Sequence, residues 1–332
     1  MKISVCMATY NGERFVEKQL QTIREQTRPV DEVIICDDGS TDSTRAICES
    51  FIRKYALHNW KFYENETNLG FCLNFFGAIE KASGNLIFLA DQDDEWFPQK
   101  VARMEEVFRE HPEVTVLSSR YDVIDEQSGV LEHSGVTYLG NRFDGSLEFL
   151  SADSFITCSY IRGFATAFRA SLKTVLKPME LKSMLAHDWL INILGAICGK
   201  TAVLNEKLVG YRYHRDNVSL ADMTRTSLIG DPGKRIAGLK ESIAAHSFLA
   251  QADFVQDEKL RQKLKKAARF EIERLRFLER KNLLIWLKLA FSLSSYRRYY
   301  RSFSGGIRVW LGDFCYAYRV NFKTRSRLNP KA

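Results

Sequence analysis

The sequence predicts an α/β protein with a mostly parallel sheet flanked by helices. Short apolar runs alternate with helical patterns about every 25 to 35 residues. The runs at residues 3–8, 33–36 and 86–90 are apolar almost throughout, which is typical of strands buried on both faces of a sheet. Turn residues or carboxylates follow each run directly. These features predict a doubly wound sheet that carries polar groups along one edge.

The first strand–helix unit lies within residues 3–29. Residues 3–8 predict a strand, and the turn sequence TYNG at 9–12 ends it. Apolar positions at helical spacing follow over 15–23, and Pro29 ends the helix.

Two further units follow. Residues 33–36 predict a second strand that ends in the sequence DDGS, and the residues after it cap a helix whose apolar face spans 47–55. Residues 60–63 predict a third strand. The segment NLGFCLNF then opens a helix that continues to Ala82.

Three carboxylates, Asp91, Asp93 and Asp94, follow the apolar run Leu86 to Ala90. Clustered negative charges repel one another, and a hard divalent cation is the simplest partner to offset that cost. An acidic turn is the alternative, because Asp also favours loops and helix starts.

The polar strand ends should meet in one crevice. Right-handed parallel crossovers bring residues 9–11, 37–38 and 91–93 to the same edge of the sheet, where ligands of open α/β sheets bind. This convergence favours a binding site over three unrelated turns. Neither GxGxxG nor GxxxxGK[ST] occurs, so a dinucleotide fold and a P-loop nucleotidase are not indicated.

Composition and charge limit the possible partners. The seven cysteines form no CxxC pair, and neither a signal peptide nor an apolar run of membrane-spanning length is found, so a cytoplasmic protein is expected. Residues 261–332 hold 19 Lys and Arg against 4 Asp and Glu, a balance of +15, which leaves −8 for the other 260 residues. A basic tail on an acidic body predicts contact with something anionic. No nucleic-acid motif is present, so nucleic acid is not the expected partner.

Four motifs carry a family resemblance. SVCMATYNG, VIICDDGSTD, NLGFCLNF and LADQDDEW, in this order, resemble the nucleotide-binding half of family 2 glycosyltransferases with the GT-A fold, over residues 1 to about 120. The DQDD-W form, with HDWL at 187–190 and YRYH at 211–214, is more narrowly similar to the rhamnosyltransferase-type members that build bacterial surface polysaccharides.

The resemblance implies an inverting transfer of one sugar from a nucleoside diphosphate sugar, either dTDP-rhamnose or a UDP-hexose. The acceptor would be a hydroxyl of a saccharide, expected to be lipid-linked, in capsule, O-antigen or cell-wall polysaccharide synthesis. The QxxRW motif of processive synthases is absent, which favours single transfers.

The same resemblance implies roles for individual residues. Asp93 and Asp91 would ligate manganese or magnesium (Mn2+ or Mg2+), with His214 as a further ligand, and Asp94 would support them or cap a helix. The nucleotide-sugar contacts would come from Thr9, Tyr10, Asn11, Asp38, Asn68, Gly70, Asp91, Gln92 and Arg212.

Asp188 is the candidate catalytic base. It opens an apolar helical run, so a simple N-terminal capping role is equally open from the residues alone. By resemblance to the inverting members, Asp188 would take the proton of the acceptor hydroxyl. The preceding His187 would either tune this base or lie on the surface, and Arg162 would contact an acceptor phosphate or face water.

The expected organisation is a catalytic domain over 1–220, with a nucleotide-sugar half at 1–120 and an acceptor half at 121–220, followed by a basic helical region over 221–332. Within that region, residues 283–301 combine an apolar run with Tyr and Arg. They suit either an anionic membrane at the inner face of the cell membrane or a helix packed on the catalytic domain or on a second subunit, as in a homodimer.

Two other functions stay open at this stage. A nucleotidyltransferase on a related sheet would need a Gly-rich first loop with Lys or Arg, and TYNG argues against it. A non-catalytic scaffold in a membrane-associated assembly would instead use the basic tail as its working surface.

Overall fold

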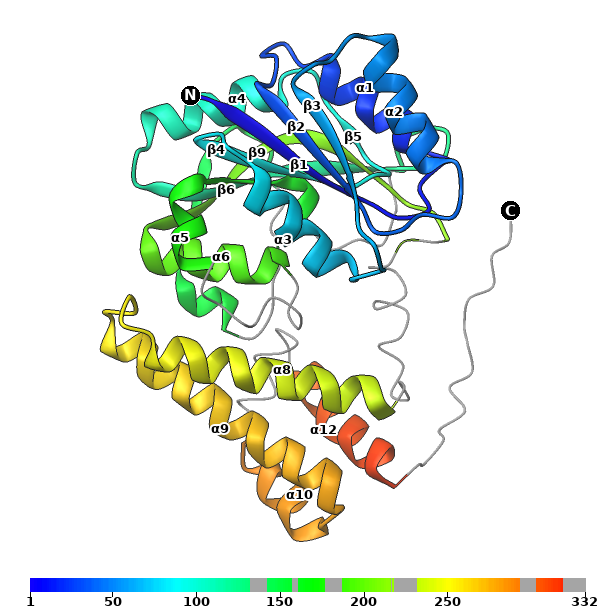
Figure 1. The fold of residues 1–332 in the computed structure, drawn as a ribbon. Coiled ribbons are helices and arrows are strands. Elements are labelled where there is room, and N and C mark those ends of the chain that lie inside the picture. The colour runs from blue at the N-terminus through cyan, green and yellow to red at the C-terminus, as the bar shows by residue number, and fades with distance from the viewer. Residues whose placement is uncertain are drawn as a thin grey trace. The chain divides into compact units, whose positions relative to one another are not determined.

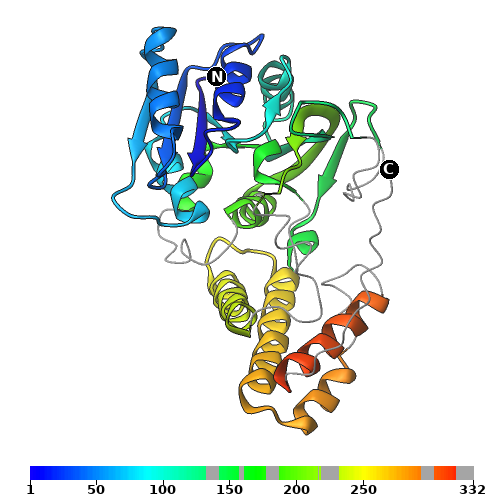
Figure 2. The same ribbon diagram turned by 90° about the vertical axis from the view of Figure 1, so that its right-hand side faces the viewer.

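The chain folds into a nine-stranded sheet with helices on both faces and a separate bundle of helices (Figures 1 and 2). The computed structural model describes residues 1–131, 142–156, 161–176, 187–215, 217, 232–292 and 303–318. Two compact units result, one of residues 1–214 with 252–260 and the other of 215–251 with 261–332. The predicted domain boundary near residue 220 lies outside the described residues.

The sheet has the strand order β3-β2-β1-β4-β8-β6-β9-β5, and β7 pairs with β9. Its strands are β1 (Ile3–Thr9), β2 (Glu32–Asp37), β3 (Trp60–Glu64), β4 (Leu86–Ala90), β5 (Glu95–Trp96), β6 (Val114–Ile124), β7 (Leu147–Leu150), β8 (Thr166–Arg169) and β9 (Lys200–Arg212). β1 runs parallel to β2 and β4, β2 to β3, and β6 to β9. β8 lies antiparallel between β4 and β6, so the sheet is mixed but mostly parallel, as predicted.

Helices cover both faces of the sheet. They are α1 (Val16–Arg24), α2 (Thr44–Lys54), α3 (Phe71–Lys81), α4 (Lys100–Glu110), α5 (Lys173–Leu176) and α6 (His187–Cys198). α1 packs beside α2 on one face, whereas α3 and α6 pack on the other (Figure 1). Every residue of β4 is buried, because the helices on both sides cover it. This burial explains why its sequence is a continuous apolar run rather than an alternating one.

Short 3₁₀ turns flank strand β8. One covers Ala152–Phe155, a second covers Gly163–Ala165 and leads directly into β8, and a third at Ala170–Leu172 follows it. The segment around Gly163 therefore runs as a tight turn before a short strand.

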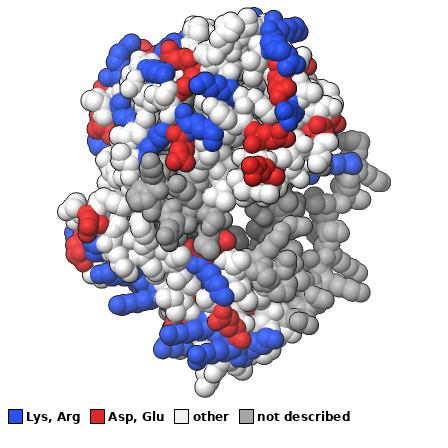
Figure 3. Space-filling model, in the orientation of Figure 1, with Lys and Arg blue, Asp and Glu red and all other residues white. Residues whose placement is uncertain are grey.

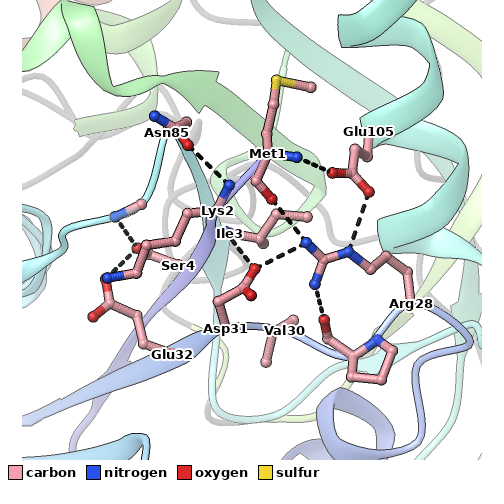
Figure 4. A network of polar contacts seen from close by, with 12 residues as sticks. Met1, Lys2, Ile3, Ser4, Arg28, Val30, Asp31, Glu32, Asn85 and Glu105 are labelled. Carbon is pink, nitrogen blue, oxygen red and sulfur yellow. Dashed lines mark hydrogen bonds and ion pairs between the residues drawn. The ribbon is translucent and has the colours of Figure 1, made fainter.

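A polar network joins the amino ends of the parallel strands, at the edge opposite their carboxyl ends (Figure 4). Arg28 donates to the Met1 carbonyl at 2.8 Å, to Asp31 Oδ2 at 2.9 Å and to Glu105 Oε2 at 3.2 Å. Asp31 also accepts from the Ile3 amide at 2.8 Å. These contacts tie β1 to the segment before β2 and to α4, so this edge serves the fold.

The second unit consists of helices, which confirms the predicted helical C-terminal region. They are α8 (Pro232–Gln251), α9 (Glu258–Arg280), α10 (Leu283–Ala290) and α12 (Phe303–Ala317). The Arg274 guanidinium binds both oxygens of the buried Asp313, at 2.8 and 3.0 Å, and joins α9 to α12. Across the described part of the chain, no helix has the length and apolar character needed to cross a membrane.

Candidate functional site

The carboxyl ends of β1, β2 and β4 lie at one edge of the sheet. Thr9 pairs with Asp37 in the register of β1 and β2, and Met7 pairs with Ala90 in the register of β1 and β4. Asn11 follows β1 with a φ of 48°, a left-handed conformation that Asn adopts more readily than most residues. The predicted convergence of the polar strand ends is therefore present.

The loops after these strands hold one another by specific hydrogen bonds. The Asn11 amide donates to Ser40 Oγ at 2.9 Å, and Asn11 Oδ1 accepts from the Thr41 amide at 2.8 Å. The Tyr10 amide donates to Gln92 Oε1 at 2.8 Å, and Gln92 Nε2 donates back to the Tyr10 carbonyl at 3.0 Å. Gln92 thus fixes the turn after β1 through the backbone, whereas the Tyr10 side chain stays largely exposed.

Thr9 and Asp38 are buried residues that order this edge. Thr9 Oγ1 donates to Asp37 Oδ1 at 2.7 Å. The Asp38 carboxylate accepts from the amides of Leu69 and Gly70, both at 2.8 Å, and also from the Asn65 side chain at 2.9 Å. These bonds hold the turn before α3, so Asp38 has a clear structural task. Its predicted contact with the base stays a prediction.

Gly70 and Asn68 belong to the same turn. Gly70 has a φ of 83°, which a residue with a side chain adopts only with strain. Asn68 Nδ2 donates to the Asp38 carbonyl at 3.1 Å, and its Oδ1 accepts from the Gly70 amide at 3.2 Å. Both residues therefore shape the loop that flanks this edge.

The carboxylates Asp91, Asp93 and Asp94 form one cluster, in which one oxygen of each lies within 4.8 Å of the others. Burial, and then the charges of Asp93 and Asp188, raise the pKa of Asp91 to about 7. Burial, and then the charges of Asp93 and Asp91, raise the pKa of Asp94 well above its usual value. The cluster therefore holds its negative charge at an energetic cost in the absence of a positive partner.

The residues of this cluster fit a hard divalent cation. Asp94 Oδ1 accepts from the Arg212 amide at 3.0 Å, while its buried Oδ2 has no hydrogen-bond partner within the described structure. His214 Nε2 lies 2.8 Å from Asp93 Oδ2, so an imidazole reaches the same cluster from the end of β9. Several carboxylate oxygens with one imidazole suit Mg2+ or Mn2+.

Arg212, for which we predict a phosphate contact, is buried within the protein. Its guanidinium is buried and donates to the carbonyls of Asp93 at 2.9 Å and Asp125 at 2.7 Å, and it forms an ion pair with Glu95. The side chain thus supports the acidic loop from within the protein. A buried Arg that bonds within the protein looks the same in sequence as an exposed one, and the contact of Arg212 with phosphate stays a prediction.

Lys100 is a neighbour of the cluster that sequence reasoning missed. It is fully buried at the start of α4, where Nζ donates to the Phe164 carbonyl at 2.7 Å and lies 3.8 Å from the centroid of the Trp96 ring. Burial lowers the pKa of Lys100, and the charges of Asp94 and Asp91 oppose that shift. The sequence did contain an indication that Lys100 is buried, because Lys100 falls on the apolar face of its helix.

Asp188 lies in the first turn of α6, where Oδ1 accepts from the Trp189 amide at 2.6 Å. Burial raises the pKa of Asp188 to about 6, although the amides of Trp189 and Gly163 and the charge of Arg162 act in the opposite direction. The charge of Asp188 in turn raises the pKa of Asp91. Asp188 and the acidic cluster therefore share one electrostatic environment.

His187 is buried, so the surface position, one of the two alternatives for this residue, is wrong. Its ring stacks on Phe75 with 4.0 Å between centroids, and neither ring nitrogen has a hydrogen-bond partner in the described ranges. Burial lowers the pKa of His187 to about 3, which keeps the ring neutral. A Cβ on Gly163 would lie 2.7 Å from its Nε2, so the 3₁₀ turn at Gly163 fits closely against this ring.

Comparison with known proteins shows which sequences and structures this chain is similar to. The sequence model of Glycosyl transferase family 2 matches residues 4–176, which is more than half of the 332 residues. An uncharacterized glycosyltransferase from Nostoc sp. is 27% identical over 230 residues, covering 68% of this chain and 69% of that protein. The dTDP-rhamnosyl transferase RfbG of Shigella flexneri is 38% identical over 99 residues, which cover 29% of this chain and 34% of that protein.

A solved structure has the same fold. Residues 1–349 of TarS from S. aureus, in complex with UDP-GlcNAc, superimpose with a TM-score of 0.62 at 19% identity, covering 96% of this chain and 90% of that one.

Proposed function

Since the chain belongs to glycosyl transferase family 2, we propose that it is an inverting, metal-dependent enzyme that moves one sugar from a nucleoside diphosphate sugar to a saccharide hydroxyl. One observation carries the proposal. The acidic cluster at the end of β4 and Asp188 at the start of α6 come from segments far apart in the chain, yet the charge of Asp188 raises the pKa of Asp91. This arrangement offers one place for the diphosphate and another for a base.

The donor side would be organised around Asp93. Asp93, Asp91 and His214 would hold Mn2+ or Mg2+, which when bound supplies a Lewis acid for the charge that grows on the leaving diphosphate. Arg212 fixes the Asp93 carbonyl and keeps this loop in place. Tyr10, Asn11 and Gln92 line the turn that the nucleotide would meet.

The acceptor side would depend on Asp188. A carboxyl group with a pKa of about 6 is ionised at neutral pH, yet it is a stronger base than an ordinary Asp. As the acceptor hydroxyl attacks C1 of the donor sugar, Asp188 Oδ would receive its proton and the C1–O bond to the diphosphate would break. Attack from the side opposite the leaving group inverts the anomeric centre.

For the donor we propose dTDP-rhamnose or a UDP-hexose, on the strength of the rhamnosyl transferase among the relatives and the UDP-GlcNAc complex of TarS. For the acceptor we propose a lipid-linked saccharide of a bacterial surface polysaccharide, with the protein held peripherally at an anionic membrane. A lipid-linked acceptor would require the enzyme to work at the bilayer.

A donor panel tests the proposal directly. Released nucleoside diphosphate is measured with UDP- and dTDP-sugars in the presence of Mn2+ or Mg2+, and titration calorimetry measures binding of UDP and dTDP. We expect binding that requires the cation and turnover that Asp188→Asn slows strongly, while Arg28→Met, at the opposite edge of the sheet, retains turnover. If every nucleotide fails to bind, or if Asp188→Asn turns over at the rate of the wild type, the corresponding assignment is wrong.

A further inference from the structure

Helix α10 carries two different apolar faces. Ile285, Trp286 and Leu289 point into the core of the helical unit. The Trp286 ring stacks on Trp310 with 4.0 Å between centroids, and each indole N–H donates to the backbone carbonyl of the other residue, at 3.0 and 3.1 Å. This face is fully used in holding α10 against α12.

The second face is exposed and consists of Leu283, Leu284, Leu287 and Phe291, which we call the outer face. An α-helix turns by about 100° per residue, so these four positions fall within an arc of roughly 100°. Leu284 is 75% exposed and Phe291 is 93% exposed. Single exposed leucines are ordinary, but four large apolar side chains on one side of a short helix mark an interaction surface.

The exposed residues next to α10 in the chain carry a net positive charge. Arg276, Arg280 and Lys281 are exposed just before α10, and the exposed Lys288 follows Leu287 on the helix itself. Two carboxylates lie in the same stretch: the exposed Glu279, and Glu273, which pairs with Arg276 at 2.5 Å. In the lower part of Figure 3, Lys and Arg side chains outnumber the Asp and Glu side chains among them, and white atoms remain between the charged groups. The surface thus combines an apolar centre with a basic rim.

This combination favours an anionic bilayer over a second copy of the chain. A two-fold contact through the outer face would bring one basic rim against another, and the like charges would repel. In an anionic leaflet the same Lys and Arg side chains would meet lipid phosphates, while Leu and Phe would enter the acyl boundary. A helix of about 12 Å is too short to cross a membrane but can lie in its plane.

We propose that the outer face of α10 inserts into the surface of an anionic membrane and anchors the protein there. The inference rests on the peripheral association that is part of the proposed function, and it identifies the residues that make the contact. The face does not belong to the donor site or to the base, so changes to it should leave the chemistry intact.

Vesicle flotation tests this inference. The full chain is mixed with phosphatidylcholine vesicles, or with vesicles that also contain about a third phosphatidylglycerol. We expect the wild type to float with the anionic vesicles, and Leu284→Ser/Phe291→Ser to lose about a hundredfold in affinity, because each apolar side chain contributes roughly tenfold to partitioning. The matched control is Leu311→Ser on α12, an exposed leucine outside the outer face, which should bind within about twofold of the wild type.

Several results would overturn the inference. These are a wild type that does not float, a double variant that floats as well as the wild type, and equal binding to both kinds of vesicle. If light scattering shows that the wild type is a dimer and the double variant a monomer, and the wild type does not bind vesicles, the outer face contacts a second copy of the chain instead. Circular dichroism and turnover on a water-soluble acceptor show whether the variant is folded. Because flotation needs no sugar nucleotide, vesicle binding without turnover would refute only the proposed function.

Discussion

Replacing Asp188 with Asn is expected to slow transfer strongly and, at the same time, to stabilise the fold. Burial raises the pKa of Asp188 from 3.8 to about 6. The folded protein therefore binds more protons at this site than the unfolded chain does between these two values. Stability falls as the pH rises through that window, and above pH 6 the full penalty of a partly buried, charged carboxylate is present. Asn has the same shape and no charge, so it removes the penalty.

The magnitude follows from the size of the shift. About two pH units at roughly 1.4 kcal/mol each give an upper limit of about 3 kcal/mol. The Asn side chain loses the favourable interaction of a carboxylate with the amino end of α6, which offsets roughly 0.3 to 1 kcal/mol. We therefore expect a net gain of at most about 2 to 3 kcal/mol at pH 8, which corresponds to a rise of a few degrees in Tm. Turnover should fall by about 10²- to 10⁴-fold, as for loss of a general base.

Thermal unfolding of wild type and Asp188→Asn at pH 8 and at pH 4.5 measures the first effect, and initial rates at pH 8 measure the second. The gain in Tm should be larger at pH 8 than at pH 4.5, where Asp188 is protonated in the folded wild type. Wild-type turnover should rise with pH up to about 6 and then level off. A variant that is less stable at pH 8, or a gain that does not depend on pH, would show that burial does not strain this carboxylate.

Four further predictions concern other residues. Asp93→Asn should weaken Mn2+ binding by roughly 10- to 100-fold in calorimetry, in the range seen when groups around a metal are lost; unchanged affinity would exclude Asp93 as a ligand. Arg212→Lys should lower both Tm and Mn2+ affinity, since Lys cannot replace the several bonds that fix the acidic loop. Gly163→Ala should cost about 1 to 3 kcal/mol by crowding His187 and should reduce turnover; a fully active, equally stable variant would contradict the close fit. Arg28→Met should lower stability by about 1 to 2 kcal/mol with turnover unchanged, because its bonds lie at the opposite edge of the sheet.

Much of the fold was predictable from local sequence. The buried strands β1, β2 and β4 are short apolar runs, and their period and flanking turns identify them without any knowledge of their partners. The acidic cluster was predictable for the same reason, since Asp91, Asp93 and Asp94 are neighbours in the chain. The antiparallel placement of β8 between β4 and β6 was not predictable, because strand order depends on contacts between distant segments.

The same distinction, between local sequence and contacts of distant segments, applies to the roles of single charged residues. By itself, the sequence determined that a parallel sheet ends in a group of carboxylates and that Asp188 opens a helix. Tertiary structure alone decided that Arg212 is buried beneath the acidic loop, that Lys100 lies next to the cluster and that His187 is a neutral ring in the core. The physical reason is that periodicity reports which face of an element is apolar, whereas the role of a charge depends on burial and on partners that are often about a hundred positions away in the chain.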